Sequence, residues 1–365
     1  MSGKDTSADS GDSTGFGGGG AAVELARAYD VALLDLDGVV YTGARAVPHA
    51  VEALTEARKR GMGLAFVTNN AARTPKTVAG HLVELGVPAE PEDVVTSAQA
   101  AARVVAERVP AGASVLVVGG EGLEVALLER GLVPVRSADD EPAAVVQGFA
   151  PDVDWKVLAE ASYAVGRGVF WVASNADLTI PTERGIAPGN GALVGVVRAA
   201  TGAEPVVAGK PELPLHRETI LRTGAKRPLV VGDRLDTDIE GARNAGVDSL
   251  LVLTGVTTPE GLLAAEEGRR PTFVAEDLRA LLTAPVTATR DGDTWTCGGW
   301  SARVADETLT IEGAGSRVDG LRAACAATWA ADSPVDTTGV TTRLGFPATA
   351  LAPGLTPASA TPTNP

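Results

Sequence analysis

The sequence contains few of the residues that mark several common protein classes. Its 365 residues include two cysteines, three histidines and only 4% aromatic residues. Cys297 and Cys325 cannot build the disulfide framework of a small secreted protein, and three histidines far apart in the chain, with no cysteine nearby, argue against a zinc site. Apolar residues still make up 45% of the chain, so alanine, valine and leucine supply the material for large cores.

Long apolar runs are also missing, as are excess positive charges. No run approaches the ~20 residues that cross a bilayer, and residues 1–20 lack the apolar region of a signal peptide. The 31 Lys and Arg against 46 Asp and Glu give a net charge of −15, which repels nucleic acid and anionic lipid. We therefore expect a soluble cytoplasmic protein that binds neither nucleic acid nor membrane.

Composition divides the chain into tails and folded parts. Residues 1–22 are rich in Gly, Ser, Asp and Thr, and residues 337–365 in Thr, Ala and Pro, so both segments are predicted to be disordered tails. Residues 285–335 contain one expected strand, Thr308–Ile311, and one expected helix, Val318–Ala330. They are predicted to form a small C-terminal α+β unit.

Between these parts, short apolar runs alternate with amphipathic stretches. This alternation predicts parallel sheets with helices on both faces. The runs expected to be strands are Val31–Leu34, Gly63–Val67, Val115–Val118, Ala143–Val146, Val169–Ala173, Leu229–Val231 and Leu250–Leu253. Ligands of such sheets bind outside the carboxyl ends of the strands, so the residues that follow each run are the candidates for function.

Two carboxylates follow the first of these runs. Asp35 and Asp37 are separated by one residue, and Gly38 allows the chain to leave sharply. At ~4 Å, two like charges repel by about 4 kcal/mol at an effective dielectric constant of 20, so the pair calls for a cation or a shared proton. A calcium-binding loop is a poor alternative, because the third ligand position and the closing glutamate are absent.

Three more polar clusters lie at or beside strand ends. Thr68, Asn69 and Asn70 can hold phosphate oxygens, although an Asn pair after a strand is often only a turn. Lys210 lies between glycine and proline, and taken alone this pattern favours a solvated surface lysine. The segment Gly232–Asp238 carries three carboxylates, an arrangement that calls for a metal ion.

Together the clusters supply carboxylates for Mg²⁺, polar groups for a phosphate and a spare aspartate for proton transfer. This inventory favours phosphoryl transfer through an aspartyl-phosphate. The sequence has no G-x-x-x-x-G-K-[ST] loop and no G-x-S-x-G elbow, and Gly119–Gly122 is only a fragment of a dinucleotide-binding fingerprint.

In this order, the clusters resemble the four motifs of the haloacid dehalogenase (HAD) superfamily. The likeness covers about residues 25–285. Within it, Gly209–Pro211 and the residues of the fourth cluster, Gly232–Asp238, are similar to the NagD and p-nitrophenyl phosphatase branch. The segments Thr96–Gln99, Pro181–Gly185 and Pro188–Gly191 are similar to the glycerol 3-phosphate phosphatases of actinobacteria.

The resemblance implies a role for each motif residue. Asp35 would be the nucleophile and Asp37 the general acid and base, while the carboxylates of Asp35 and Asp233 and the backbone carbonyl of Asp37 would hold Mg²⁺. The residues expected to bind the phosphoryl oxygens are Thr68, Asn69, Asn70 and Lys210. Asp238 would hold a metal-bound water, and Asp236 would orient Lys210 or Arg234.

The resemblance and the spacing of the motifs together divide the folded part. The interval between Asn70 and Lys210 is far longer than a core crossover needs, so it must hold an inserted domain. We expect a Rossmann-like parallel-sheet HAD core (residues 23–99 and 205–283), an α/β cap of the C2 type (100–204) and the C-terminal unit (285–335). The last resembles an acetyltransferase-like (GNAT-like) module and is too short to bind acetyl-CoA, which favours a structural or oligomerisation role.

The expected substrate is a small phosphomonoester, since a cap of this size leaves little room for a protein. Asn175 and Asp177 are the candidate cap residues that read the substrate, although the same segment is also typical of a plain Asx turn. Glycerol 3-phosphate is the expected substrate, and phosphoglycolate, pyridoxal phosphate or a nucleotide are alternatives. The remaining alternative to a phosphatase is a non-catalytic binding protein on the same fold. The chain could also form a homo-oligomer.

Overall fold

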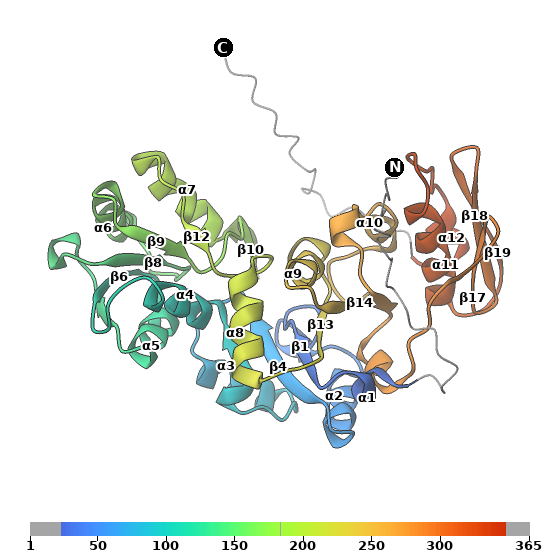
Figure 1. The fold of residues 1–365 in the computed structure, drawn as a ribbon, viewed down its shortest axis with the longest axis horizontal. Coiled ribbons are helices and arrows are strands. Elements are labelled where there is room, and N and C mark those ends of the chain that lie inside the picture. Colours follow the sequence, from blue (N-terminus) through green and yellow to red (C-terminus); the bar gives the residue numbers. More distant parts are fainter. Residues whose placement is uncertain (1–22, 183, 348–365) are drawn as a thin grey trace, which may run out of the picture.

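A computed structural model describes residues 23–182 and 184–347. Three units follow one another along the long axis of the molecule, with the core between the cap and the C-terminal unit (Figure 1). The expected tails over residues 1–22 and 348–365 lie outside the described residues. None of the described helices combines the length and the apolarity that a bilayer crossing requires.

The core is built on a six-stranded parallel sheet with the order β15-β14-β13-β1-β4-β5. Its strands are β1 (Val31–Leu34), β4 (Gly63–Thr68), β5 (Val94–Thr96), β13 (Pro228–Gly232), β14 (Asp248–Val252) and β15 (Phe273–Ala275). Strand β1 is buried throughout, because its side chains alternate between two apolar clusters on opposite faces of the sheet. In the register, Leu34 lies beside both Val231 and Phe66, so β1, β13 and β4 end together at one edge.

Helices cover both faces of this sheet. They are α1 (Leu25–Ala28), α2 (Ala50–Lys59), α3 (Pro75–Glu84), α8 (Leu213–Thr223), α9 (Glu240–Asn244) and α10 (Pro259–Leu263), with the short turns η1 (Pro91–Asp93), η3 (Leu235–Ile239), η4 (Glu267–Arg269) and η5 (Leu278–Leu282). Local sequence explains where they begin. The Thr74 hydroxyl, for example, accepts a hydrogen bond from the Thr77 N–H, and Pro75 occupies the first turn of α3. A small hairpin, β2 (Tyr41–Thr42) with β3 (Arg45–Ala46), follows β1.

The cap has its own parallel sheet with the order β12-β9-β8-β6-β7. Its elements are β6 (Ser114–Val118), β7 (Val133–Val135), β8 (Ala144–Gln147), β9 (Phe170–Ala173), β12 (Val206–Val207), α4 (Ser97–Ala106), α5 (Glu121–Glu129), η2 (Ala138–Asp140), α6 (Trp155–Gly166) and α7 (Asn190–Thr201). An antiparallel hairpin, β10 (Thr179–Thr182) with β11 (Gly185–Pro188), extends from it. The cap sheet runs past the expected boundary at residue 204, because β12 pairs with β9.

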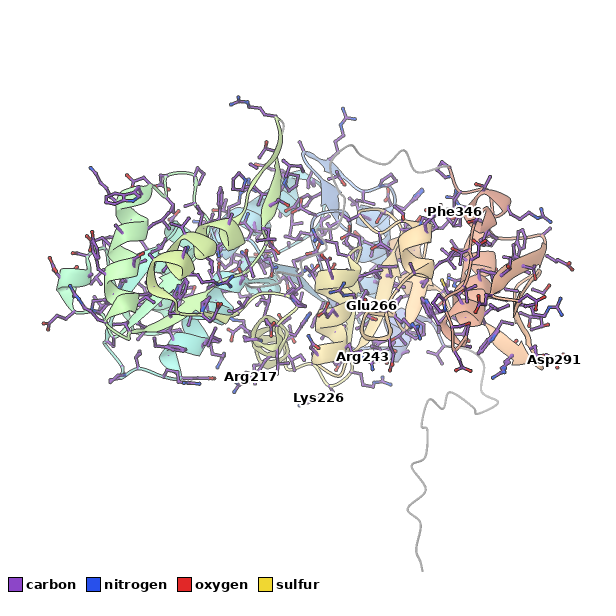
Figure 2. All side chains as sticks on the ribbon, turned by 90° about the horizontal axis from the view of Figure 1, so that it is seen from above. Arg217, Lys226, Arg243, Glu266, Asp291 and Phe346 are labelled. Carbon is purple, nitrogen blue, oxygen red and sulfur yellow. The ribbon has the colours of Figure 1, made fainter. Side chains whose placement is uncertain are left out.

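The C-terminal unit is a four-stranded antiparallel sheet packed against α11 (Arg317–Trp329). Its strands are β16 (Thr289–Asp291), β17 (Thr294–Cys297), β18 (Trp300–Ala305) and β19 (Thr308–Gly313). The prediction that the tail begins at residue 337 is wrong for residues 337–347, which carry α12 (Val340–Arg343). The reason is apolar burial: Val340, Leu344 and Phe346 pack into the core of this unit, where Figure 2 labels Phe346.

Candidate active site

The site forms where the core strands β1, β4 and β13 end. Asp35 follows β1, Thr68 is the last residue of β4, and Asp233 follows β13. Lys210 reaches the same edge from the segment before α8. The structure therefore brings together all four polar clusters that the sequence placed at or beside strand ends.

Lys210 is a buried active-site group, which excludes the surface-lysine interpretation. Its side chain is only 4% exposed, and its Nζ donates hydrogen bonds to Asp35 Oδ1 at 2.5 Å and Asp238 Oδ1 at 2.7 Å. Burial alone would lower the pKa of Lys210, but the carboxylates of Asp238 and Asp35 raise it above its ordinary value. The ammonium therefore stays charged and fixes both carboxylates.

Three carboxylates converge at this edge of the sheet. Ligand oxygens of Asp35, Asp233 and Asp238 all lie within 4.8 Å of one another. Asp233 is fully buried; its Oδ2 accepts a hydrogen bond from the Val256 N–H at 2.6 Å, and its Oδ1 has no hydrogen-bond partner among the described residues. Burial and then Asp238 raise the pKa of Asp233 to about 6, while burial raises that of Asp35 to about 8 against the opposing charge of Lys210.

This donor set fits a divalent cation. One ammonium cannot neutralise three buried carboxylates, and an unpartnered carboxylate oxygen in such a cluster is a ready-made ligand for a hard cation such as Mg²⁺. Asp238, which we expected to hold a metal-bound water, contributes its own carboxylate to this group. The backbone carbonyl of Asp37 as a further ligand stays a prediction.

Two glycines leave room for Asp233. Gly38 has a φ of +83°, and a Cβ atom there would lie 2.6 Å from Asp233 Oδ2. A Cβ on Gly255 would lie only 1.9 Å from the same atom. The first glycine belongs to a recognised motif, whereas Gly255, in the loop after β14, was missed because nothing nearby in the sequence marks it.

Asp37 leaves the cluster and faces solvent on the loop toward the β2–β3 hairpin. Partial desolvation raises the pKa of its carboxyl group, against the opposing charges of Lys210, Arg73 and His81. A carboxyl group that retains its proton more readily than usual is suited to donate that proton.

The side chains of the Thr68–Asn70 loop have structural partners that the sequence did not predict. Asn69 Oδ1 accepts a hydrogen bond from the Lys210 N–H at 2.8 Å, and Asn69 Nδ2 donates to the Lys210 carbonyl at 3.1 Å. Asn70 Oδ1 accepts from the backbone N–H groups of Ala72 and Arg73, and the Thr68 hydroxyl accepts from the Asn70 N–H. The asparagine side chains thus shape the loop and hold Lys210 in place.

The two candidate cap residues differ in their surroundings. Asn175 is buried: its Nδ2 donates to the Asn69 carbonyl at 2.7 Å, and its Oδ1 accepts from the Asp177 N–H at 3.2 Å, which is the Asx turn. Asp177 is half-buried, and its carboxylate accepts from Asn69 Nδ2 at 3.3 Å. Burial raises the pKa of Asp177 against the opposing influence of Asn69 and Arg234. Asp177 therefore faces the core, while Asn175 holds the loop.

Asp236 and Asp238, the last two carboxylates of the fourth motif, have different hydrogen-bond partners. Asp236 forms a bidentate pair with Arg234, at 3.0 Å and 2.8 Å, whereas the Lys210 ammonium bonds Asp35 and Asp238. Asp238 accepts hydrogen bonds from Lys210 and from the Arg234 N–H at 3.1 Å. Of the two expected partners of Asp236, the structure selects Arg234.

Comparisons with known proteins agree with this geometry. Residues 32–133 match the family described as haloacid dehalogenase-like hydrolase, and residues 207–281 match the HAD-hydrolase-like family. The chain is 50% identical over 257 residues to the D-glycerol 3-phosphate phosphatase of Mycobacterium tuberculosis, covering 70% of this chain and 72% of that protein. The chain belongs to the haloacid dehalogenase-like hydrolases.

Other relatives of this HAD hydrolase place it among phosphatases. It is 38% identical to the 5′-nucleotidase YutF of Bacillus subtilis, over 69% of this chain and 97% of that protein. A crystal structure of the glycerol phosphate phosphatase of M. tuberculosis in complex with magnesium superposes with a TM-score of 0.79 at 44% identity, over 86% of this chain and 94% of that chain. These findings confirm the superfamily and fold class expected from the four motifs.

The C-terminal unit of the HAD hydrolase also has a match. Residues 297–344 match the GCN5-related N-acetyltransferase-like domain family, which confirms the likeness seen in the sequence. The match extends beyond residue 335, as does the folded unit in the structure.

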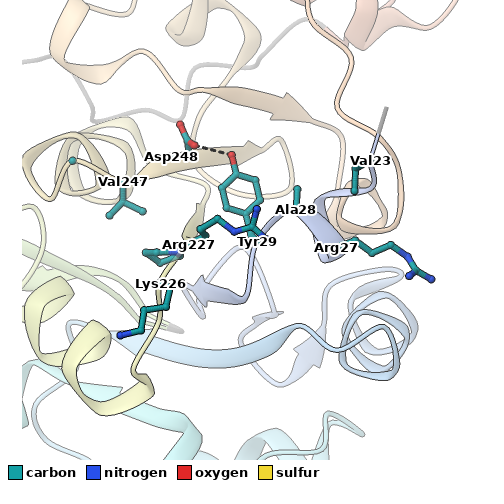
Figure 3. Close-up of a pocket in the computed structure, with 10 residues that line it drawn as sticks. Val23, Arg27, Ala28, Tyr29, Lys226, Arg227, Val247 and Asp248 are labelled. Carbon is teal, nitrogen blue, oxygen red and sulfur yellow. Dashed lines mark hydrogen bonds between the residues drawn. The ribbon is translucent and has the colours of Figure 1, made fainter. Parts of the chain in front are cut away.

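A hollow lies at the opposite end of the core sheet from the candidate active site. Its volume is about 490 Å³, and it is lined by residues at the amino ends of β1, β13 and β14, among them Tyr29, Arg227 and Asp248 (Figure 3). The Tyr29 hydroxyl donates to Asp248 Oδ2 at 2.7 Å. In the figure, Arg27 and Lys226 point to different sides, so the basic residues do not converge on one ligand position.

Proposed function

We propose that this HAD hydrolase is a Mg²⁺-dependent phosphatase that hydrolyses glycerol 3-phosphate, with transient transfer of the phosphoryl group to Asp35. One observation carries the proposal: Lys210 bridges Asp35 and Asp238 beside the unpartnered oxygen of Asp233. The 50% identity to a D-glycerol 3-phosphate phosphatase supports the choice of substrate.

The carboxylates of Asp35 and Asp233 would hold Mg²⁺, together with the backbone carbonyl of Asp37. When bound, the ion offsets the excess negative charge of the cluster and draws electron density from the phosphoryl oxygens. The unpartnered Oδ1 of Asp233 is the atom in this structure that supports the assignment.

The first chemical step uses Asp35 and Asp37. A carboxylate oxygen of Asp35 forms a bond to phosphorus, the bond between phosphorus and the alkyl oxygen breaks, and the Asp37 carboxylic acid donates its proton to the departing oxygen. Glycerol leaves with that proton. Lys210 fixes the attacking carboxylate, and the Thr68–Asn70 loop is the segment expected to bind the phosphoryl oxygens.

The second step restores the enzyme. Asp37, now ionised, takes a proton from a water molecule whose oxygen attacks phosphorus, and the bond between phosphorus and Asp35 breaks. Inorganic phosphate leaves, and Asp37 again carries its proton.

The cap supports a small polyol phosphate as substrate. Asp177 faces the core, and its carboxylate can accept hydrogen bonds from hydroxyl groups while it repels a second carboxylate on the substrate. Residues 174–191 include no Phe, Tyr or Trp, which disfavours the stacking of a ring from pyridoxal phosphate or a nucleotide. A 5′-nucleotide is the second candidate, because one relative is named a 5′-nucleotidase.

The decisive experiment compares kcat/KM for glycerol 3-phosphate, phosphoglycolate and a 5′-nucleotide at saturating Mg²⁺. We expect glycerol 3-phosphate to exceed phosphoglycolate by on the order of 10²-fold, and Asp177→Ala to reduce this ratio. Asp152→Ala, at an exposed position elsewhere on the cap, is the matched control and should leave the ratio unchanged.

Each outcome bears on a different part of the proposal. Faster turnover of phosphoglycolate or of the nucleotide would overturn the substrate and leave the phosphatase class in place. An unchanged ratio in Asp177→Ala would overturn the role of Asp177. If no phosphomonoester released phosphate in the presence of Mg²⁺, the protein would be a non-catalytic member of the fold.

A further inference from the structure

A buried carboxylate outside the active site gathers three arginines. Glu218, in the middle of α8, is 0% exposed. Its Oε1 accepts hydrogen bonds from Arg130 Nη2 at 2.7 Å and from Arg222 Nε at 2.5 Å, and its Oε2 accepts one from Arg103 Nε. We refer to these four residues as the Glu218 cluster.

The cluster joins the core helix that follows Lys210 to two helices of the cap. Glu218 and Arg222 lie on α8, Arg103 on α4, and Arg130 directly after α5. Helix α4 packs against both α5 and α8, and Figure 1 shows the three helices at the junction between the two units. The hydrogen bonds to Glu218 therefore cross from core to cap.

The helices that carry the cluster begin at the catalytic loops. At the start of α4, the Ser97 hydroxyl donates to the Asn69 carbonyl at 2.7 Å. Helix α8 begins just after Lys210, whose N–H bonds Asn69. A change in the angle between α4 and α8 would therefore move the cap loop with Asp177 relative to Lys210 and Asp35.

The charges in the cluster depend on one another. Three guanidinium groups meet at Glu218, and a second carboxylate, that of Glu129, lies 3.6 Å from Arg222 Nη2. Although burial tends to raise it, the arginines, Arg103 first, hold the pKa of Glu218 below its ordinary value. Buried ion pairs add little net stability compared with apolar packing, so the gain from such a cluster is a defined geometry.

We propose that Glu218 is a positioning residue that fixes the cap over the active site by holding Arg103 and Arg130 against α8. The inference rests on the proposed function, since it assigns to the cap the reading of the substrate. Glu218 acts through Asp177 and Lys210 and does not touch the reacting atoms.

The kinetic test uses Glu218→Gln and two substrates. Hydrolysis of glycerol 3-phosphate depends on the cap. p-Nitrophenyl phosphate has a good leaving group, so its hydrolysis needs less precise alignment of the reacting groups. Because a small misplacement of reacting groups can cost on the order of 10²-fold, we expect kcat/KM for glycerol 3-phosphate to fall about tenfold further than that for p-nitrophenyl phosphate.

The matched control is Arg217→Gln, which breaks the exposed pair between Arg217 and Glu107 that also joins α8 to α4, at 3.2 Å. Arg217 lies at the surface of the molecule (Figure 2), and its loss should leave both substrates unaffected. If Glu218→Gln does not fold, Arg103→Gln replaces it, since Glu218 then keeps two arginines. An equal loss of kcat/KM on both substrates in Glu218→Gln would overturn the proposal. So would a larger loss on glycerol 3-phosphate than on p-nitrophenyl phosphate in Arg217→Gln.

A distance measurement tests the positioning role without reference to catalysis. Spin labels at Tyr163→Cys in the cap and Val83→Cys in the core, both exposed, report the separation of the two units; the native cysteines are buried. We expect a broader distance distribution in Glu218→Gln and Arg103→Gln, and no change in Arg217→Gln. An identical distribution in all variants would refute the positioning role. A wild type that cleaves only p-nitrophenyl phosphate would instead refute the proposed substrate, and the labels would still decide on Glu218.

Discussion

Replacing Asp233 by Asn should stabilise the metal-free protein and abolish its response to Mg²⁺. Carboxylate oxygens of Asp35, Asp233 and Asp238 lie within 4.8 Å of one another, so each pair, when both groups are charged, repels by at least ~3.5 kcal/mol at an effective dielectric constant of 20. Lys210 bonds Asp35 and Asp238 but not Asp233, whose charge is therefore the least compensated. An amide keeps the acceptor for the Val256 N–H and removes the charge.

We expect Asp233→Asn to raise the free energy of unfolding by on the order of 3 kcal/mol in the presence of a chelator, and the melting temperature by several degrees. Saturating Mg²⁺ at a hundredfold excess over Kd should stabilise the wild type by about 2.7 kcal/mol and the variant far less. Thermal unfolding with and without Mg²⁺ measures both effects. Asp236→Asn, in the same loop but paired with Arg234, is the control that should change neither. A variant that melts below wild type in chelator, yet gains the same stability from Mg²⁺, would refute the charge argument.

Three further predictions concern single residues. Asp35→Asn should abolish phosphate release while Mg²⁺ still binds more weakly through Asp233; turnover within about tenfold of wild type would rule out Asp35 as the nucleophile. Asp37→Asn should lose far more activity on glycerol 3-phosphate than on p-nitrophenyl phosphate, because nitrophenolate needs little protonation, and equal losses in kcat would speak against proton donation. Burial lowers the pKa of His216 to about 3, so the folded state keeps it neutral and stability is lost as pH falls below its ordinary pKa of about 6.5. Between pH 7 and pH 5, denaturant titrations should therefore show the wild type losing about 2 kcal/mol more than His216→Leu, and parallel losses would contradict a neutral buried imidazole.

The sequence predicts the position of the candidate site well because the polar residues that follow each strand are encoded locally. A buried strand with an apolar run from Val31 to Leu34 must end where Asp35 begins, and the same reasoning holds for β4 and β13. Parallel pairing then carries these ends to one edge without any further information. The positions of β1, β4 and β13 and the approach of Asp35 to Asp233 follow from these short patterns.

Contacts between segments far apart in the chain could not be predicted in this way. Asn69 and Lys210 are separated by 141 positions, and nothing in either segment shows that the Asn69 amide bonds the lysine backbone. The same applies to the approach of Gly255 to Asp233 and to the choice of Arg234 as the partner of Asp236. Short strands such as β5 and β7 were missed because three residues carry no periodicity.

Composition was misleading at the C-terminal tail, where α12 was not expected. A Thr-rich stretch resembles a disordered tail, yet the few apolar side chains within it fit gaps that only the folded unit supplies. Leu344 packs where Gly320 of α11 has no side chain: a Cβ there would lie 2.2 Å from Leu344 Cδ2. The Arg317 guanidinium lies over the Phe346 ring, 4.9 Å from its centroid.

Truncation after Asp336 should therefore destabilise the C-terminal unit. Each buried side chain of Val340, Leu344 and Phe346 contributes about 1.5–3 kcal/mol, so the loss should be on the order of 5 kcal/mol. Unfolding followed by tryptophan fluorescence reports on this unit, since it contains Trp295, Trp300 and Trp329. The chain ending at Pro347 is the matched reference, because it retains α12. Gly320→Ala should destabilise in the same direction by about 1–3 kcal/mol through overpacking against Leu344. If the chain ending at Asp336 unfolds at the same denaturant concentration as the chain ending at Pro347, then α12 adds nothing to the stability of the unit and its apolar contacts do not hold it in place.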